Sequence, residues 1–261
     1  MYSIDKIKIL IHGIKNPIIQ NLLNKLSNIL DKDLIYYKSN AVVKCYDNFM
    51  YRGIYVGFSN NWNKSFSNRY TNVVLEWNPN KINLEEFPVD LRILFDDLRR
   101  IEIMSCDVCK DIEIPITDLI VLKHHESQRM NILSHNTIET IYLGQFNDNG
   151  FCRIYNKAKE LKIEGDLTRI EVHITHIGFI GYEEVDFKPI TILKVDENID
   201  LNDTQKVLII ACYNMPHLLQ LLEPRRRRQI KQLMKSNLEQ VDISVEEIKE
   251  CIKNFKFMEG I

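Results

Sequence analysis

The sequence predicts an α+β fold, with a central antiparallel sheet flanked by helices and a helical C-terminal tail. Up to residue 174, short runs rich in Tyr, Val and Ile recur between Asn, Ser and Gly residues, a pattern typical of strands. Beyond residue 204, apolar residues recur at the three- and four-residue spacing of helices. We therefore expect a main body over residues 1–200 and a helical region over residues 201–261.

The N-terminal half is expected to contain a helix, a group of strands and a second helix. The first helix covers residues 16–30, where an Asn-Pro start precedes apolar residues at helical spacing. Strands follow between residues 34 and 77 in the segments AVVKCY, RGIYVGF and TNVVLEW. Pro88 then precedes a helix expected over residues 90–99.

The strands of the second half are expected at residues 106–114, 137–143, 150–157 and 167–174. The second and third of these flank QFNDNG, whose Asn, Asp and Gly residues favour a hairpin turn. After the strands, helical spacing returns in three segments, VLIIACYNM, PHLLQLLEPRRRRQIKQLMK and SVEEIKECIKNF.

Composition excludes several classes of protein. Hydrophobic residues make up 45% and charged residues 27% of the 261 positions, the balance of a folded globular protein. No run approaches the roughly 18 apolar residues of a membrane span, and the N-terminus lacks a signal-peptide cleavage site, so we expect a cytoplasmic protein. Six scattered cysteines predict free thiols, and a single CxxC does not make a zinc site.

Polar side chains gather on one side of several predicted strands, because successive strand residues point to opposite faces. In FCRIYNK, Arg153 and Tyr155 point away from Cys152 and Ile154. The same alternation in the neighbouring segments adds five polar residues, Arg169, Glu171, His173, Asp107 and Asp111. A half-solvated antiparallel sheet produces such alternation without any function, so the kinds of group present carry the argument.

Several short motifs resemble one known family. RIYNKAKE begins at Arg153 and is followed by TRIEV at residues 168–172, while TIYLG, LEWNPNK and CDVCKDI come before it. In this order they resemble the Rep proteins of the pT181-like rolling-circle plasmid family (the Rep_trans, or replication initiation factor, family). Two departures occur: Cys109 stands where the family commonly has alanine, and Cys106 where an arginine that contacts phosphate is common.

The resemblance implies that Tyr155 is a nucleophile that cuts one DNA strand, leaving a 5′-phosphotyrosine and a free 3′-hydroxyl. It also implies that Mg²⁺ or Mn²⁺, held by nearby carboxylates, activates the scissile phosphate. A tyrosine has a pKa near 10 and needs such help at neutral pH. Arg153 lies about 6 to 7 Å away on the same face, close enough to hold the phosphate or favour the phenolate. Lys157 is the third catalytic candidate.

Four carboxylates are candidates for the metal site. We favour Asp107 with Glu171 as the ligand pair, ahead of Asp111 and Glu160. Asp107 and Asp111 are four strand positions apart, about 13 Å on a straight strand, so both cannot reach one ion. Each acid, taken singly, is also compatible with an ordinary solvated or salt-bridged carboxylate.

Local basic charge compensates for a formal net charge of only −2. PRRRRQIKQLMK concentrates basic residues in about three helical turns. The predicted DNA-binding residues are Arg169 and five residues of this segment, Arg225, Arg226, Arg227, Arg228 and Lys231. A solvated helix face that balances the acidic SVEEIKE segment is the competing interpretation.

The favoured function is initiation of rolling-circle replication by metal-dependent, sequence-specific nicking and joining of one DNA strand. A relaxase-like or phage replication initiator would use the same chemistry, and a non-catalytic origin-binding regulator is the alternative outside the enzymes. The expected partners are double-stranded origin DNA and the single strand at the nick; a host helicase and a homodimer are expectations of the family.

Overall fold

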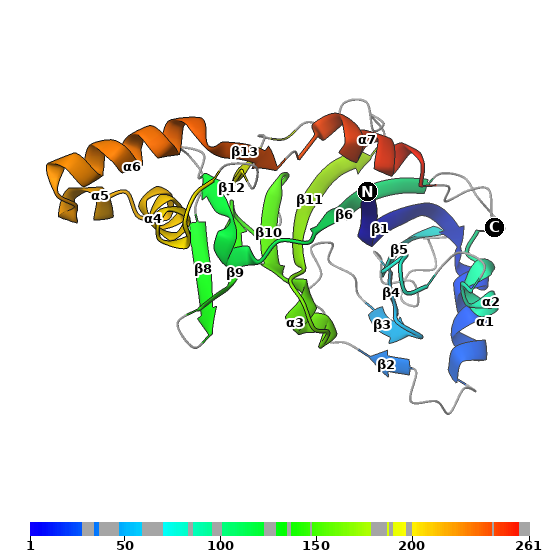
Figure 1. Cartoon of the computed structure of the whole chain (residues 1–261). Helices are drawn as coiled ribbons and strands as arrows, with labels where there is room; N and C mark the ends of the chain where they lie inside the picture. Colours follow the sequence, from blue (N-terminus) through cyan, green and yellow to red (C-terminus); the bar gives the residue numbers. More distant parts are fainter. Residues whose placement is uncertain are drawn as a thin grey trace. The chain divides into compact units, whose positions relative to one another are not determined.

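The computed structural model confirms the α+β class: antiparallel sheets are flanked by helices (Figure 1). It describes residues 1–27, 34–36, 47–58, 70–82, 86–95, 101–122, 129–134, 137–146, 148–178, 187, 190–196, 200–241 and 243–255. The chain forms two compact units. The N-terminal unit comprises Tyr2–Cys109, His173–Val185 and Ile248–Ile261, and the hairpin unit comprises Lys110–Val172 and Asp186–Glu247 with Met1.

The N-terminal unit is built on a sheet in the order β2-β3-β4-β5-β1-β6. Its strands are β1 (Tyr2–Lys15), β2 (Leu34–Tyr36), β3 (Asp47–Tyr51), β4 (Ile54–Phe58), β5 (Tyr70–Trp77) and β6 (Ile101–Ile112), the last of which continues into the hairpin unit. β1 and β5 pair antiparallel with Ile9 opposite Leu75, and both side chains are fully buried. Val74 is buried as well, so β5 is covered on both faces rather than on one.

Two helices belong to the same unit. α1 (Asn16–Ser27) begins at the predicted Asn-Pro start and buries Ile19, Leu22 and Leu26. α2 (Val89–Arg92) is much shorter than the helix predicted over residues 90–99, of which residues 96–99 lie outside the described residues. The strand predicted in AVVKCY also lies outside them.

The hairpin unit contains strands in the order β11-β10-β9-β8, drawn in green in Figure 1. They are β8 (Arg129–Ser134), β9 (Thr137–Leu143), β10 (Phe151–Asn156) and β11 (Thr168–Gly178), whose last residues belong to the N-terminal unit. The predicted β9–β10 hairpin is confirmed, with Tyr142 opposite Arg153 and Thr140 opposite Tyr155. Its turn is closed by a hydrogen bond from the Phe151 N–H to the Asp148 carbonyl at 3.1 Å; residue 147 is outside the described residues.

The C-terminal region contains the predicted helices and one strand that was not predicted. The elements are α4 (Asp203–Asn214), α5 (Leu218–Leu221), α6 (Pro224–Ser236), β13 (Leu238–Val241) and α7 (Val245–Lys253). β13 pairs with β12 (Thr191–Val195), which pairs with β7 (Ile120–Leu122). Ile209 of α4 packs into a core with Ile120 and Val195. The predicted division at residue 200 stays a prediction.

Two short helices complete the hairpin unit, η1 (Ile116–Asp118) and α3 (Lys157–Leu161).

Among the described residues, no helix has both the length and the apolar character that crossing a membrane requires.

Replacing Gly150 with alanine should destabilise the hairpin unit. Gly150 has a φ of +78°, and an added Cβ would lie 2.8 Å from the Cβ of the buried Phe187. Left-handed backbone strain and overpacking together should lower the free energy of unfolding by about 2–4 kcal/mol in urea titrations. Gly165→Ala is the matched control, because its φ is +101° but nothing lies within 4 Å of the added Cβ. Equal losses at the two positions would contradict the predicted clash.

Candidate active site

Tyr155 lies where β10 gives way to α3. Asn156 caps this short helix, and its side-chain oxygen accepts a hydrogen bond from the Lys159 N–H at 2.9 Å. The Lys157 and Ala158 N–H groups donate to the Leu167 carbonyl at 2.7 and 3.2 Å, which fixes the change of direction after the strand. The backbone that follows Tyr155 is therefore fixed, and only 9% of Tyr155 is exposed.

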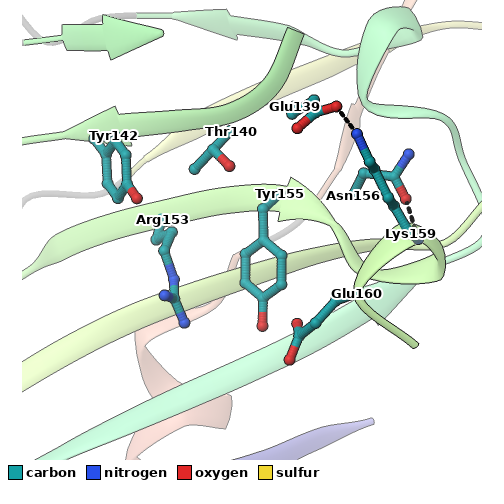
Figure 2. A pocket seen from close by; sticks show the side chains of 8 residues that line it. All are labelled: Glu139, Thr140, Tyr142, Arg153, Tyr155, Asn156, Lys159 and Glu160. Carbon is teal, nitrogen blue, oxygen red and sulfur yellow. Dashed lines mark hydrogen bonds and ion pairs between the residues drawn. The ribbon is translucent and has the colours of Figure 1, made fainter. Parts of the chain in front are cut away.

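A groove of about 310 Å³ opens beside Tyr155 (Figure 2). It is lined by residues of β9, β10 and α3, namely Glu139, Thr140, Tyr142, Arg153, Tyr155, Asn156, Lys159 and Glu160. Figure 2 shows the Tyr155 ring between Arg153 and Glu160. Tyr142 and Thr140 were not predicted as site residues, although counting outward from the predicted hairpin turn would have placed them opposite Arg153 and Tyr155.

Two cations and two carboxylates surround the Tyr155 ring. The Arg153 guanidinium carbon lies 4.6 Å from the ring centroid and the Lys157 Nζ lies 5.6 Å from it. Arg153 Nη2 donates to both oxygens of Glu171, at 2.7 and 2.9 Å. Lys157 Nζ donates to Glu160 Oε2 at 2.9 Å. The structure thus brings together five residues that the sequence singled out.

The Tyr155 hydroxyl is held in its protonated form. Burial raises its pKa well above the ordinary value, and the negative charge of Glu171 raises it further. Arg153 lowers the pKa, as expected from the sequence, but this effect is too small to offset burial and the carboxylates. The expected activation of the phenolate by Arg153 is therefore outweighed in the protein without substrate.

Glu160 behaves in the opposite way. Partial burial raises the pKa of its carboxyl, but the hydrogen bond from Lys157, the Tyr155 hydroxyl and the nearby positive charges outweigh burial and lower this pKa. An ionised carboxylate therefore lies beside a protonated Tyr155 (Figure 2).

The other predicted metal ligands also have basic partners. Asp111 accepts hydrogen bonds on both oxygens from Arg169, at 2.6 and 2.7 Å, and Asp107 bonds to His173 Nδ1 in the N-terminal unit. The favoured pair, Asp107 with Glu171, is divided between the two units and stays a prediction. Within the described part of the chain, no three His, Cys, Asp or Glu side chains form a ready metal cluster.

The predicted DNA-binding residues are in different environments. Arg169 is buried against Asp111, whereas Arg225, Arg226, Arg228 and Lys231 are exposed on α6. Arg227 instead donates to the Gln220 and Leu222 carbonyls, at 2.8 and 3.1 Å, and so holds the chain before its own helix. Sequence could not separate Arg227 from its neighbours, because the difference depends on where the preceding turn folds.

One comparison with known proteins supports the resemblance found in the motifs. No family model matches the sequence. A replication initiation protein of Staphylococcus aureus is 23% identical over 171 residues, which cover 63% of this chain and 54% of that protein. The chain therefore spans about half the length of this relative, and it is similar to a replication initiation protein.

A solved structure also aligns with this chain, the rolling circle replication initiator protein from Geobacillus stearothermophilus. The TM-score is 0.40 at 11% sequence identity, covering 67% of this chain and 74% of that one.

The raised pKa of Tyr155 predicts a loss of stability at alkaline pH. An unfolded tyrosine releases its proton near pH 10, whereas the folded Tyr155 retains it. Below about pH 10 neither state ionises; above it, proton release favours the unfolded chain, so the free energy of unfolding falls. Urea titrations at about pH 9 and 11 should show a smaller fall for Tyr155→Phe than for the wild type. Tyr70→Phe controls for loss of an exposed hydroxyl; the same fall in all three proteins would contradict the burial effect.

Proposed function

We propose that the protein initiates rolling-circle replication of a plasmid or related element by cutting one strand of origin DNA with Tyr155. The observation that carries this proposal is the groove beside Tyr155, where a tyrosine hydroxyl, cationic side chains and carboxylates lie together on the elements that carry the motifs. Similarity to a replication initiation protein supports the biological role.

The proposed reaction is transfer of a phosphoryl group to tyrosine. The Tyr155 oxygen attacks the phosphorus, the bond from phosphorus to the 3′ oxygen breaks, and the 5′ side of the cut strand becomes a phosphotyrosine. The phenol proton leaves toward Glu160, whose ionised carboxylate lines the same groove, and the departing 3′ oxygen takes a proton from solvent. Reversal of these steps by a 3′-hydroxyl would rejoin the strand.

Arg153 is the proposed phosphate ligand. Its side chain lines the groove and is 37% exposed, so its guanidinium can meet a phosphate oxygen although Nη2 is bonded to Glu171. A guanidinium forms strong charge-assisted hydrogen bonds with phosphate oxygens. Lys157 lies against the same ring and would add positive charge near the phosphorus.

A divalent cation is part of the proposal, and Mg²⁺ or Mn²⁺ fits the oxygen donors around Tyr155. Mg²⁺ is commonly held by one or two carboxylates together with substrate phosphates and water, so a cluster of three protein ligands is not required. Glu160 lines the groove and Glu171 is bonded to the Arg153 side chain that lies against the Tyr155 ring, so these two are the proposed ligands; Asp107 and Asp111 stay predictions. Bound there, the ion would stabilise charge that builds on the phosphate.

The exposed arginines of α6 are the proposed origin-binding surface. They lie within the first five residues of the helix, near the end where the helix dipole is positive and cations are unfavourable. Because this placement does not help the helix, a role in binding phosphates is the better explanation. Origin DNA is the proposed partner; a host helicase and a homodimer stay predictions.

A non-catalytic origin-binding regulator is the second candidate function. It is supported by the raised pKa of Tyr155 and by the pairing of each nearby carboxylate with a cation. Relaxase-like and phage initiators share the cutting chemistry and differ in the DNA that they use. Formation of a covalent adduct separates the regulator from all of the cutting enzymes.

Tyr155→Phe should abolish the covalent adduct and leave DNA binding intact. The full-length protein is incubated with supercoiled DNA of its own origin region and Mg²⁺ or Mn²⁺, and protein-linked nicked circles are measured on denaturing gels. We expect adduct with the wild type, and none after addition of EDTA or with Tyr155→Phe, because the attacking oxygen is gone. Tyr142→Phe is the matched control, since Tyr142 lines the same groove. Adduct formed by Tyr155→Phe would reject this nucleophile.

Replacing Arg225, Arg226 and Arg228 with alanine should weaken binding to origin DNA and lower its salt dependence. Each lost phosphate contact should reduce the slope of log affinity against log salt by about 0.9. Fluorescence anisotropy across a salt series measures both quantities. The triple lysine variant keeps the charges and should bind nearly as the wild type does. Arg227 is left unchanged because it holds backbone carbonyls. An unchanged slope in the alanine variant would remove this helix from the binding surface.

A further inference from the structure

Three aromatic side chains continue the groove away from Tyr155. We call Tyr142, Phe151 and Phe146 the aromatic row. Tyr142 and Phe151 are stacked, with ring centroids 5.9 Å apart and planes at 15°, and Phe146 packs edge to face on Phe151 at 5.6 Å and 77°. Tyr142 also lines the groove (Figure 2), so the row begins at the groove.

The row lies on the same side of the hairpin as the proposed chemistry. Phe151, Arg153 and Tyr155 alternate along β10 and share one face, and Tyr142 is directly opposite Arg153 on β9. Phe151 is two residues from Arg153, about 6.6 Å along the strand. Rings and a cation therefore follow one another from the hairpin turn toward Tyr155.

Packing explains the inner part of this row but not its outer end. Tyr142 and Phe151 are half-buried, whereas 77% of Phe146 is exposed. A side chain so exposed removes little apolar surface from water, and its contribution to folding is correspondingly small. Phe146 instead presents a free aromatic surface at the end of a row that leads to the nucleophile.

Aromatic surface next to phosphate-binding cations is the combination that binds single-stranded nucleic acid. Bases stack on the rings without regard to sequence, while the cations contact the backbone. Arg153 lines the groove with part of its side chain exposed, and the row begins directly opposite it, at Tyr142. In a duplex the faces of the bases are stacked on one another, so only unpaired nucleotides could use these rings.

We infer that the aromatic row binds unpaired bases of the strand that Tyr155 cuts, with Phe146 as the outermost stacking platform. This inference rests on the proposed function and adds the residues that would hold the single strand next to the scissile phosphate, which are the three rings of the aromatic row. Stacking there would hold the strand along the hairpin and present one phosphate to Arg153 and Tyr155.

The test compares binding of a fluorescein-labelled oligo(dT) of about 12 nucleotides to the wild-type protein and to Phe146→Ala. Anisotropy should show affinity weakened about 5-fold or more by the substitution, with an unchanged salt slope because no charge is lost. Phe146→Trp should retain affinity, and its added indole fluorescence should be quenched by the oligonucleotide. An abasic oligonucleotide of equal length should bind both proteins alike.

Met130→Ala is the matched control, because Met130 is also an exposed apolar residue of the hairpin unit. It should bind oligo(dT) as the wild type does, and urea titrations should give the same unfolding midpoint for Phe146→Ala and wild type. The inference is overturned if the wild type does not bind oligo(dT), if Phe146→Ala binds it equally well, or if that variant loses the same affinity for abasic DNA.

The adduct assay distinguishes this inference from the proposed function. Adduct formation together with unaltered oligo(dT) binding by Phe146→Ala would reject the aromatic row alone. Binding that depends on Phe146 in a protein that never forms an adduct would reject strand cutting and leave a single-strand-binding surface.

Discussion

The ion pair between Arg153 and Glu171 determines the electrostatic state of the groove. It joins β10 to β11 through hydrogen bonds to both carboxylate oxygens, and it places a neutralised guanidinium against the Tyr155 ring. Because Glu171 offsets Arg153, burial dominates and Tyr155 stays protonated. A phosphate that approached Arg153 would compete with Glu171 for the same guanidinium. In the protein alone, Glu171 offsets the charge of Arg153 beside Tyr155. An anionic ligand that bound Arg153 would therefore change the electrostatic environment of the Tyr155 hydroxyl.

The backbone supports this arrangement through register. The tight turn that ends at Gly150 aligns β9 with β10, and the alignment puts Tyr142 and Thr140 across from Arg153 and Tyr155. Beyond the strand, the Leu167 carbonyl accepts from the first two N–H groups of α3, which carries Glu160 toward Tyr155. Tyr155, at the junction of a strand and a short helix, is thus restrained by backbone hydrogen bonds that do not involve its own hydroxyl.

The features of the groove that could be predicted from sequence are those that depend on strand periodicity and on the residues preferred in turns. Alternation along β10 correctly grouped Arg153 with Tyr155, and QFNDNG predicted the hairpin turn. Alternation shows on which face of the sheet a side chain lies, but not which residue of the next strand it contacts. It therefore could not show that Arg169 would bind Asp111 or that Asp107 would bind His173. β13 was missed because four residues are too few for a period to be visible. The direction of the Tyr155 pKa shift depends on burial, which only the assembled sheet determines.

The position of the arginines on α6 has a consequence for how salt acts on the protein. Cations near a helix N-terminus are repelled by the partial positive charge of the helix dipole there, and dissolved ions screen that repulsion. Added salt should therefore stabilise α6 itself while it weakens attraction to a polyanion. Loss of affinity at high ionic strength then reflects lost contacts with the partner rather than melting of the helix. A bound polyanion would supply negative charge next to these arginines and so reduce their repulsion from the helix dipole. We therefore expect α6 to be most stable when a polyanion is bound to it.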